Sequence, residues 1–138
     1  MENPNSQVAM RTVLIVDDTE ASAAALEIAC ATIPGIAVST VPSALHAVRI
    51  LRDRGASVQA VLTDIRMPAM TGFDLIRFMR ADPRLAAIPV IVVTADTDPD
   101  TPTLTALLGA NAYFSKPFSP RAIRETLERL LNGNQCAD

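Results

Sequence analysis

Continuous apolar runs recur along the chain, and each is followed by a stretch whose apolar residues have helical spacing. The runs at 12–16 and 88–94 show no alternation of apolar and polar residues, which is typical of strands buried on both faces. The pattern predicts five strands, at residues 12–16, 36–41, 58–63, 88–94 and 112–115.

Helix-forming stretches follow each predicted strand. They are bounded by Thr19 and Ser119, which are typical N-cap residues, and by Gly55 and Gly109, which end helices. The predicted helices span residues 21–32, 43–54, 73–80, about 103–108 and 121–131. Alternating strands and helices predict an α/β fold with a parallel sheet covered on both faces. Right-handed crossovers then place the carboxyl ends of all strands at one edge.

Polar residues follow the predicted strands at that edge. Asp17 and Asp18 come directly after the first strand, and Asp64 directly after the third. Thr94 ends the fourth strand and Lys116 follows the fifth. Ligands and chemistry collect at this edge of open α/β sheets, and packing does not explain five polar residues there. We therefore expect these side chains to form one site.

Carboxylates that share a site repel one another unless they bind a cation or a proton. Mg²⁺ prefers oxygen ligands, so Asp17 and Asp18 are candidate metal ligands beside Asp64. Taken alone, the Asp17-Asp18 pair is more typical of a helix N-terminus. A metal-assisted site would let the Asp64 carboxylate act as a nucleophile toward a phosphoryl group. Lys116 would supply a second cation, and Thr94 a hydroxyl.

Lys116 is the single lysine among the twelve basic residues. The other eleven are arginines, which suggests that arginine is used where any positive charge is sufficient. Position 116 therefore stands out as one that needs the compact ammonium of lysine. The following residue, Pro117, is consistent with a strained or cis peptide that orients the lysine side chain.

The length of 138 residues predicts one domain, 11–131, between a disordered leader at 1–10 and a tail at 132–138. A net charge of −3 provides no basic surface for nucleic acid. The sequence contains no apolar run of the roughly 20 residues that cross a membrane. Its N-terminus also lacks the pattern of a signal peptide. We expect a soluble, cytoplasmic protein that binds neither nucleic acid nor membrane directly.

Four stretches, VLIVDD, LTDIRMPAMTGFDLIR, IVVTA and GANAYFSKPF, resemble the receiver domain of two-component response regulators, of the stand-alone chemotaxis type. The resemblance covers residues 12 to about 131. It implies a doubly wound, flavodoxin-like fold with five helices and strand order 2-1-3-4-5, an order of which the chemotaxis receiver is itself a known example. It also implies a signalling module with phosphotransfer and slow autodephosphorylation, rather than a dedicated enzyme.

The resemblance assigns a role to each site residue. It implies that Asp64 is the phosphoacceptor, that Thr94 and Lys116 contact the phosphoryl group, and that Thr94 and Tyr113 form the switch. The implied Mg²⁺ ligands are Asp17, Asp18, Asp64 and the backbone carbonyl of Arg66. The implied partners are a sensor histidine kinase or phosphotransfer protein and a downstream effector protein. The sequence also leaves open a weak homodimer.

Two features depart from the family pattern. The segment 96–102 carries three acids and two prolines where the fourth helix should begin, which predicts a short or displaced helix. Arg66 and Asp96 flank the predicted site and could pair across it, and such a pair would hinder the attack of water on a phosphoryl group.

Three alternatives are weaker. A haloacid-dehalogenase-type phosphatase needs an acid two residues after the nucleophile, where this chain has Arg66. A flavodoxin-type carrier needs a phosphate-binding loop where Asp17 and Asp18 would repel phosphate. A degenerate receiver would lack site residues, and here every one is present.

Overall fold

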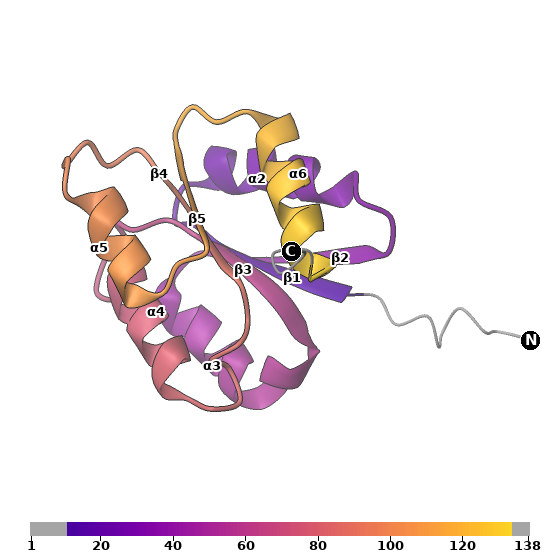
Figure 1. Cartoon of the computed structure of the whole chain (residues 1–138), viewed down its shortest axis with the longest axis horizontal. Coiled ribbons are helices and arrows are strands. Elements are labelled where there is room, and N and C mark those ends of the chain that lie inside the picture. Colours follow the sequence, from indigo (N-terminus) through magenta and orange to yellow (C-terminus); the bar gives the residue numbers. More distant parts are fainter. Residues whose placement is uncertain (1–10, 134–138) are drawn as a thin grey trace, which may run out of the picture.

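The structure is a computed structural model that describes residues 11–133, and these form a parallel sheet between two layers of helices (Figure 1). The strands are β1 (Arg11–Val16), β2 (Ile36–Val41), β3 (Val58–Thr63), β4 (Val90–Thr94) and β5 (Ala112–Ser115). The helices are α2 (Glu20–Ala31), α3 (Ala44–Arg54), the 3₁₀ turn η1 (Gly55–Ser57), α4 (Gly72–Ala81), α5 (Thr101–Leu108) and α6 (Pro120–Leu131).

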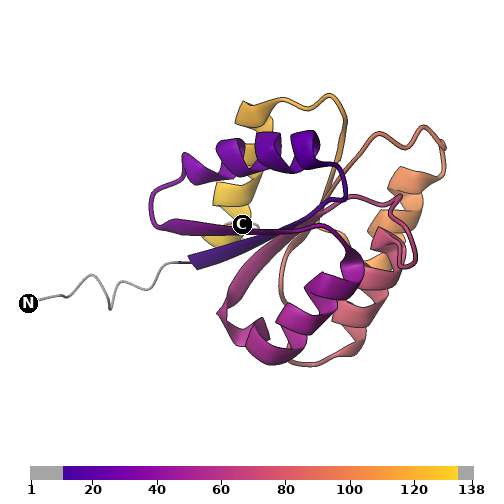
Figure 2. The same ribbon diagram turned by 180° about the vertical axis from the view of Figure 1, so that it is seen from behind.

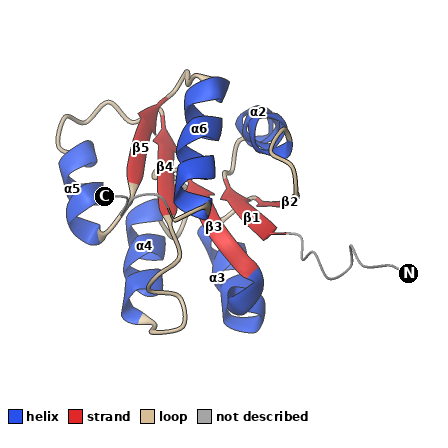
Figure 3. Ribbon diagram, turned by 45° about the vertical axis from the view of Figure 1, so that its right-hand side comes forward, coloured by secondary structure: helices blue, strands red, loops and turns tan. Residues whose placement is uncertain are grey.

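The five strands are all parallel and lie in the order β2-β1-β3-β4-β5 (Figure 3). This order confirms the predicted doubly wound, flavodoxin-like fold. Because β1 and β3 are neighbours at the centre, the residues that follow them come close together at the carboxyl edge. The predicted leader at 1–10 and most of the predicted tail lie outside the described residues.

Figure 2 shows helices on both faces of the sheet, and the hydrophobic core accordingly has two halves, one on each face. Helices α2 and α6 cover one face, where Leu26 and Leu127 pack against Ile15. Helices α3 and α4 cover the other face, where Leu51 and Leu75 pack against Leu14. Alternate residues of β1 therefore enter opposite halves, as the period of a strand requires. This double burial explains the continuous apolar runs in the sequence.

Helix starts and ends differ from prediction in detail. Thr19 takes the N-cap position of α2 but makes no capping hydrogen bond, so the prediction for its side chain is wrong. Its backbone N–H instead donates to Asp17 Oδ1 over 2.9 Å. Ser119 is confirmed as the N-cap of α6, and Gly109 ends α5 with a φ of 110°.

Helix α5 has eight residues and is the shortest α-helix of the described chain, as the segment before it predicts. It begins at Thr101, two residues earlier than expected. Pro102 causes no break there, because proline lacks only an N–H that has no partner in a first helical turn.

Candidate functional site

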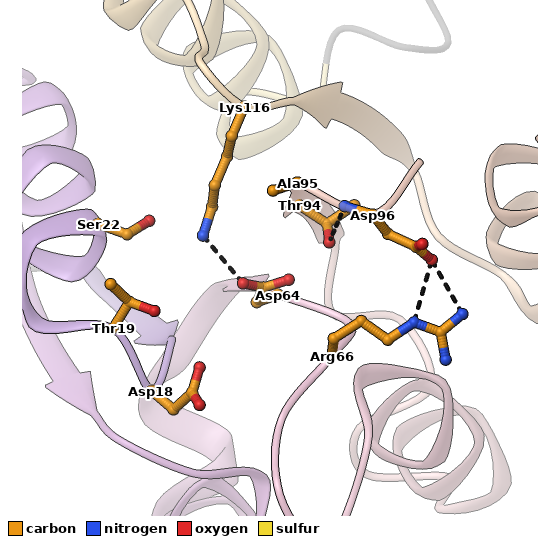
Figure 4. Close-up of a pocket in the computed structure, with 9 residues that line it drawn as sticks. All are labelled: Asp18, Thr19, Ser22, Asp64, Arg66, Thr94, Ala95, Asp96 and Lys116. Carbon is orange, nitrogen blue, oxygen red and sulfur yellow. Dashed lines mark hydrogen bonds and ion pairs between the residues drawn. The ribbon is translucent and has the colours of Figure 1, made fainter. Parts of the chain in front are cut away.

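A cavity of about 500 Å³ opens at the carboxyl edge of the sheet (Figure 4). Its lining residues end or follow β1, β3, β4 and β5 or lie in the first turn of α2. They are Asp18, Thr19, Ser22, Asp64, Arg66, Thr94, Ala95, Asp96 and Lys116. The predicted convergence of polar residues from four strands is therefore observed.

Three carboxylates meet on one side of this cavity. Oxygen atoms of Asp17, Asp18 and Asp64 all lie within 4.8 Å of one another. Asp17 and Asp64 are buried, whereas Asp18 is exposed. Carboxylates this close repel one another, and their all-oxygen donor set suits a hard divalent ion such as Mg²⁺.

Asp64 follows β3 and is held by contacts to both of its carboxylate oxygens. The backbone N–H of Ile65 donates to Oδ1 over 2.6 Å, and Lys116 Nζ donates to Oδ2 over 2.9 Å. Gly72 lies directly behind the residue, because a Cβ there would overlap the Asp64 carbonyl oxygen and Ile65. Only a glycine allows the loop after β3 to approach Asp64 this closely.

Lys116 forms ion pairs with two of the three acids, Asp17 and Asp64. Its ammonium lies 2.9 Å from Asp17 Oδ2 and 2.9 Å from Asp64 Oδ2. Burial lowers the pKa of Lys116, but the hydrogen bonds to Asp17 and Asp64 outweigh burial, so its pKa is raised. The Lys116–Pro117 peptide is cis, as the Lys-Pro step suggested. The two ion pairs with Asp17 and Asp64 direct the only lysine of the sequence into the site.

Thr94 and Asp96 line the opposite side of the cavity. Thr94 is fully buried, and its Oγ1 accepts a hydrogen bond from the Asp96 backbone N–H over 3.2 Å. The Asp96 carboxylate accepts from Thr101 Oγ1 over 2.6 Å and pairs with Arg66 over 3.0 Å. Thr101, the backbone N–H of Asp98 and Arg66 together lower the pKa of Asp96. The predicted pairing of Arg66 with Asp96 is confirmed.

Tyr113 does not line this cavity. It lies on β5 opposite Val92 and borders a separate cavity of about 150 Å³ between α5 and β5. The ring is partly buried, and burial raises the pKa of the phenol, with smaller contributions from Asp96 and Asp64. Tyr113 is therefore placed beside α5 rather than with the other predicted residues.

Sequence reasoning missed two residues of the site. Thr19 was interpreted only as a cap and Ser22 was not considered, yet both line the cavity. The signal was available: Ser22 comes four residues after Asp18, one turn along a helix that starts at the site edge.

Residues 13–128 match the response regulator receiver domain family, so the chain belongs to that family. Chemotaxis protein CheY1 of Helicobacter pylori is 35% identical over 125 residues, which cover 88% of this chain and 98% of that protein. Chemotaxis protein CheY of Pseudomonas aeruginosa is 43% identical over 70 residues, 51% of this chain and 56% of that protein. The crystal structure of a response regulator receiver protein from Pseudomonas putida is 32% identical, with a TM-score of 0.74 over 91% of this chain and 98% of that one.

Family membership fixes the class of function. The chain is a phosphoacceptor signalling domain of two-component systems, not a conventional enzyme, and a histidine kinase is the partner that this class implies. The cluster of Asp17, Asp18 and Asp64 is typical of the receiver metal site. Within residues 11–133, no helix is long and apolar enough to cross a membrane.

Proposed function

We propose that Asp64 accepts the phosphoryl group of this receiver domain. The observation that carries the proposal is the position of its carboxylate in the cavity, between the ammonium of Lys116 and two further acids. Lys116 Nζ lies 2.9 Å from Asp64 Oδ2, so its positive charge is in place for a phosphoryl group that arrives at this carboxylate. Asp64 is also held by Ile65, so little reorientation is needed before attack.

Asp17, Asp18, Asp64 and the backbone carbonyl of Arg66 are the proposed ligands of a Mg²⁺ ion. The oxygen donors at the mouth of an open cavity fit such an ion, since Mg²⁺ keeps several waters and takes few protein carboxylates. When bound, the ion would neutralise charge on the oxygens of the phosphoryl group during transfer.

In the proposed reaction, an oxygen of the Asp64 carboxylate attacks the phosphorus of a phosphohistidine on the kinase or phosphotransfer protein. The new O–P bond forms as the P–N bond breaks, and the imidazole leaves with the electron pair of that bond. Lys116 and the Thr94 hydroxyl are the proposed contacts of the transferred phosphoryl oxygens. Ala95, a small residue on the same side of the cavity, leaves room for the donor.

Thr94 and Tyr113 form the proposed switch. In this structure the Thr94 hydroxyl oxygen accepts a hydrogen bond from the Asp96 backbone N–H, so its own O–H is available to donate to a phosphoryl oxygen. The cavity beside Tyr113 provides space for its ring to change position. Reversing a population from mostly inactive to mostly active requires about 5.5 kcal/mol of differential interaction. Two or three charge-assisted hydrogen bonds of about 1.5–3 kcal/mol each would provide it.

The proposed output is the binding of an effector protein at the face that contains α5, β5 and α6. Leu104 and Leu107 of α5 are exposed there, which suits a protein partner. The net charge of −3 argues against direct nucleic-acid binding. The same apolar residues would support a weak homodimer, and we propose a cytoplasmic location because histidine kinases present their phosphohistidine there.

Incubation with acetyl phosphate, with Mg²⁺ or with EDTA, tests this function. The proposal expects an acyl phosphate that forms only with Mg²⁺ and that peptide mass spectrometry locates at Asp64. A phosphoryl group on another residue, or equal labelling in EDTA, would contradict it.

A further inference from the structure

Ser22 has the one buried side-chain nitrogen or oxygen atom in residues 11–133 that lacks a hydrogen-bond partner. Its hydroxyl is screened from solvent, although the residue lines the cavity of the proposed phosphoacceptor. An unpartnered buried hydroxyl is destabilising, and native proteins keep few of them. Its presence at this cavity indicates that the hydroxyl finds a partner in another state of the site.

The group that Ser22 faces is the ammonium of Lys116. Figure 4 shows the Ser22 hydroxyl pointing toward the end of the lysine side chain, from the side opposite Asp64. A lysine ammonium has three N–H donors. Lys116 directs two of them to carboxylate oxygens, one on Asp17 and one on Asp64. Lys116 therefore has a third N–H donor for a further acceptor, and the Ser22 hydroxyl that points toward it has an unused acceptor.

A metal ion at the proposed site would compete with Lys116 for the carboxylate of Asp17. Asp17 Oδ1 already accepts the backbone N–H of Thr19, and Asp17 Oδ2 accepts from Lys116. A cation that binds Asp17 through Oδ2 therefore competes with the lysine for that oxygen. An ammonium displaced from Asp17 keeps its contact with Asp64 but loses one hydrogen bond, and a further acceptor within reach would replace that bond.

We propose that Ser22 is a positioning residue for Lys116, whose ammonium it accepts when a divalent cation takes the oxygen of Asp17. This inference rests on the proposed metal site. It explains why a hydroxyl without a partner is kept beside the site, and why the lysine stays directed at Asp64 after it gives up Asp17. Ser22 thus favours the cation-bound form of the site.

The affinity for Mg²⁺ tests the proposal without any phosphorylation. Ser22→Ala is expected to weaken Mg²⁺ binding about tenfold, the effect of one hydrogen bond to a charged group, measured by calorimetry at constant ionic strength. The same variant should be at least as stable to heat as the parent in EDTA, because it removes a hydroxyl that has no partner there. Ser57→Ala, at an exposed serine bonded to the Arg54 carbonyl, serves as the matched control and should bind Mg²⁺ like the parent.

A double-mutant cycle with Lys116→Ala separates positioning from direct contact with the ion. If Ser22 acts through the lysine, Ser22→Ala changes the Mg²⁺ affinity of the Lys116→Ala protein by less than about twofold. A tenfold loss in that background would overturn the proposal, as would equal affinities of Ser22→Ala and the parent. Lower stability of Ser22→Ala in EDTA would also overturn it. A parent that binds no Mg²⁺ would overturn the metal site itself, and the role of Ser22 with it.

Discussion

Arg66 and Asp96 form an ion pair at one side of the cavity, with Arg66 Nη2 3.0 Å from Asp96 Oδ2 (Figure 4). Both partners are held by a second contact. The guanidinium carbon lies 5.7 Å from the centroid of the Phe73 ring, and the carboxylate accepts from Thr101. The Asp96 side chain is only 11% exposed, against 56% for Arg66. These contacts hold the pair beside the cavity, where we expect it to narrow the path of water to a phosphoryl group on Asp64.

The first prediction concerns the lifetime of that phosphoryl group. Replacing both Arg66 and Asp96 by alanine should accelerate its loss about threefold or more, because water then reaches phosphorus more freely. The decay is followed by intact mass after the phosphoryl donor is removed. The control is the double alanine variant of Arg121 and Glu125. These residues form an exposed ion pair on α6 with the same N–O distance of 3.0 Å. A double variant that keeps its phosphoryl group as long as the parent would show that the pair does not shield it.

The second prediction concerns the stability that Lys116 provides. Lys116→Met should lower the free energy of unfolding by about 1–3 kcal/mol at pH 7, because it leaves the buried carboxylates of Asp17 and Asp64 without their shared cation. Urea unfolding measures the difference. Arg121→Met, which breaks an exposed pair, should cost less than about 0.5 kcal/mol. An equal decrease in the free energy of unfolding in the two variants would mean that Lys116 stabilises the fold no more than an exposed ion pair does.

The pH dependence of this difference follows from the raised pKa of Lys116. A raised pKa in the folded state adds stability that is complete below the unfolded value of 10.5 and is lost as the pH rises through the folded value. The difference between the parent and Lys116→Met should therefore be constant between about pH 7 and 9 and decrease above about pH 10.5. Unfolding curves across this range check the sign. A difference that disappears before pH 9 would contradict the assignment.

The third prediction concerns the loop behind Asp64. Gly72→Ala should destabilise the protein by about 1–3 kcal/mol, because the new methyl group meets the Asp64 carbonyl and Ile65. Gly35→Ala is the control: its φ of 78° costs about 1–2 kcal/mol in strain, but no atom lies within 4 Å of the added carbon. Phosphorylation by acetyl phosphate should slow in Gly72→Ala alone, since only that change displaces Asp64. Equal rates in both variants would mean that the loop does not position Asp64.

The sequence allowed the fold to be predicted because its signals are local. Both the first and the last residue of β3 were predicted correctly. Its carboxyl end is marked by the change from apolar residues to the charged Asp64. Strand β4 begins at Val90 rather than at 88, because the apolar run includes Pro89, which has no N–H for the ladder. The start of α5 was missed because Pro102 was interpreted as a breaker, although proline is well suited to a first helical turn.

The site could be predicted only as far as strand ends define it. Asp17, Asp64, Thr94 and Lys116 each follow or end a strand, so the topology brings them together. Contacts between residues distant in sequence leave no such signal. Arg80 shows this, because its guanidinium donates to the carbonyls of Ala86, Ile88 and Gly109 and so ties the end of α4 to the loops around β4 and β5. The position of Ser22 could have been predicted from its helical spacing to Asp18, but its proposed role could not, because that role depends on Lys116, which lies far along the chain.

The most direct test of the account is the intact mass of the parent and of Asp64→Ala after incubation with acetyl phosphate and Mg²⁺. Circular dichroism first establishes that the variant is folded. The account predicts that the parent gains the mass of one phosphoryl group and that Asp64→Ala gains none. A parent that stays unmodified, or a variant that is still phosphorylated, would contradict the assignment of Asp64 as the phosphoacceptor.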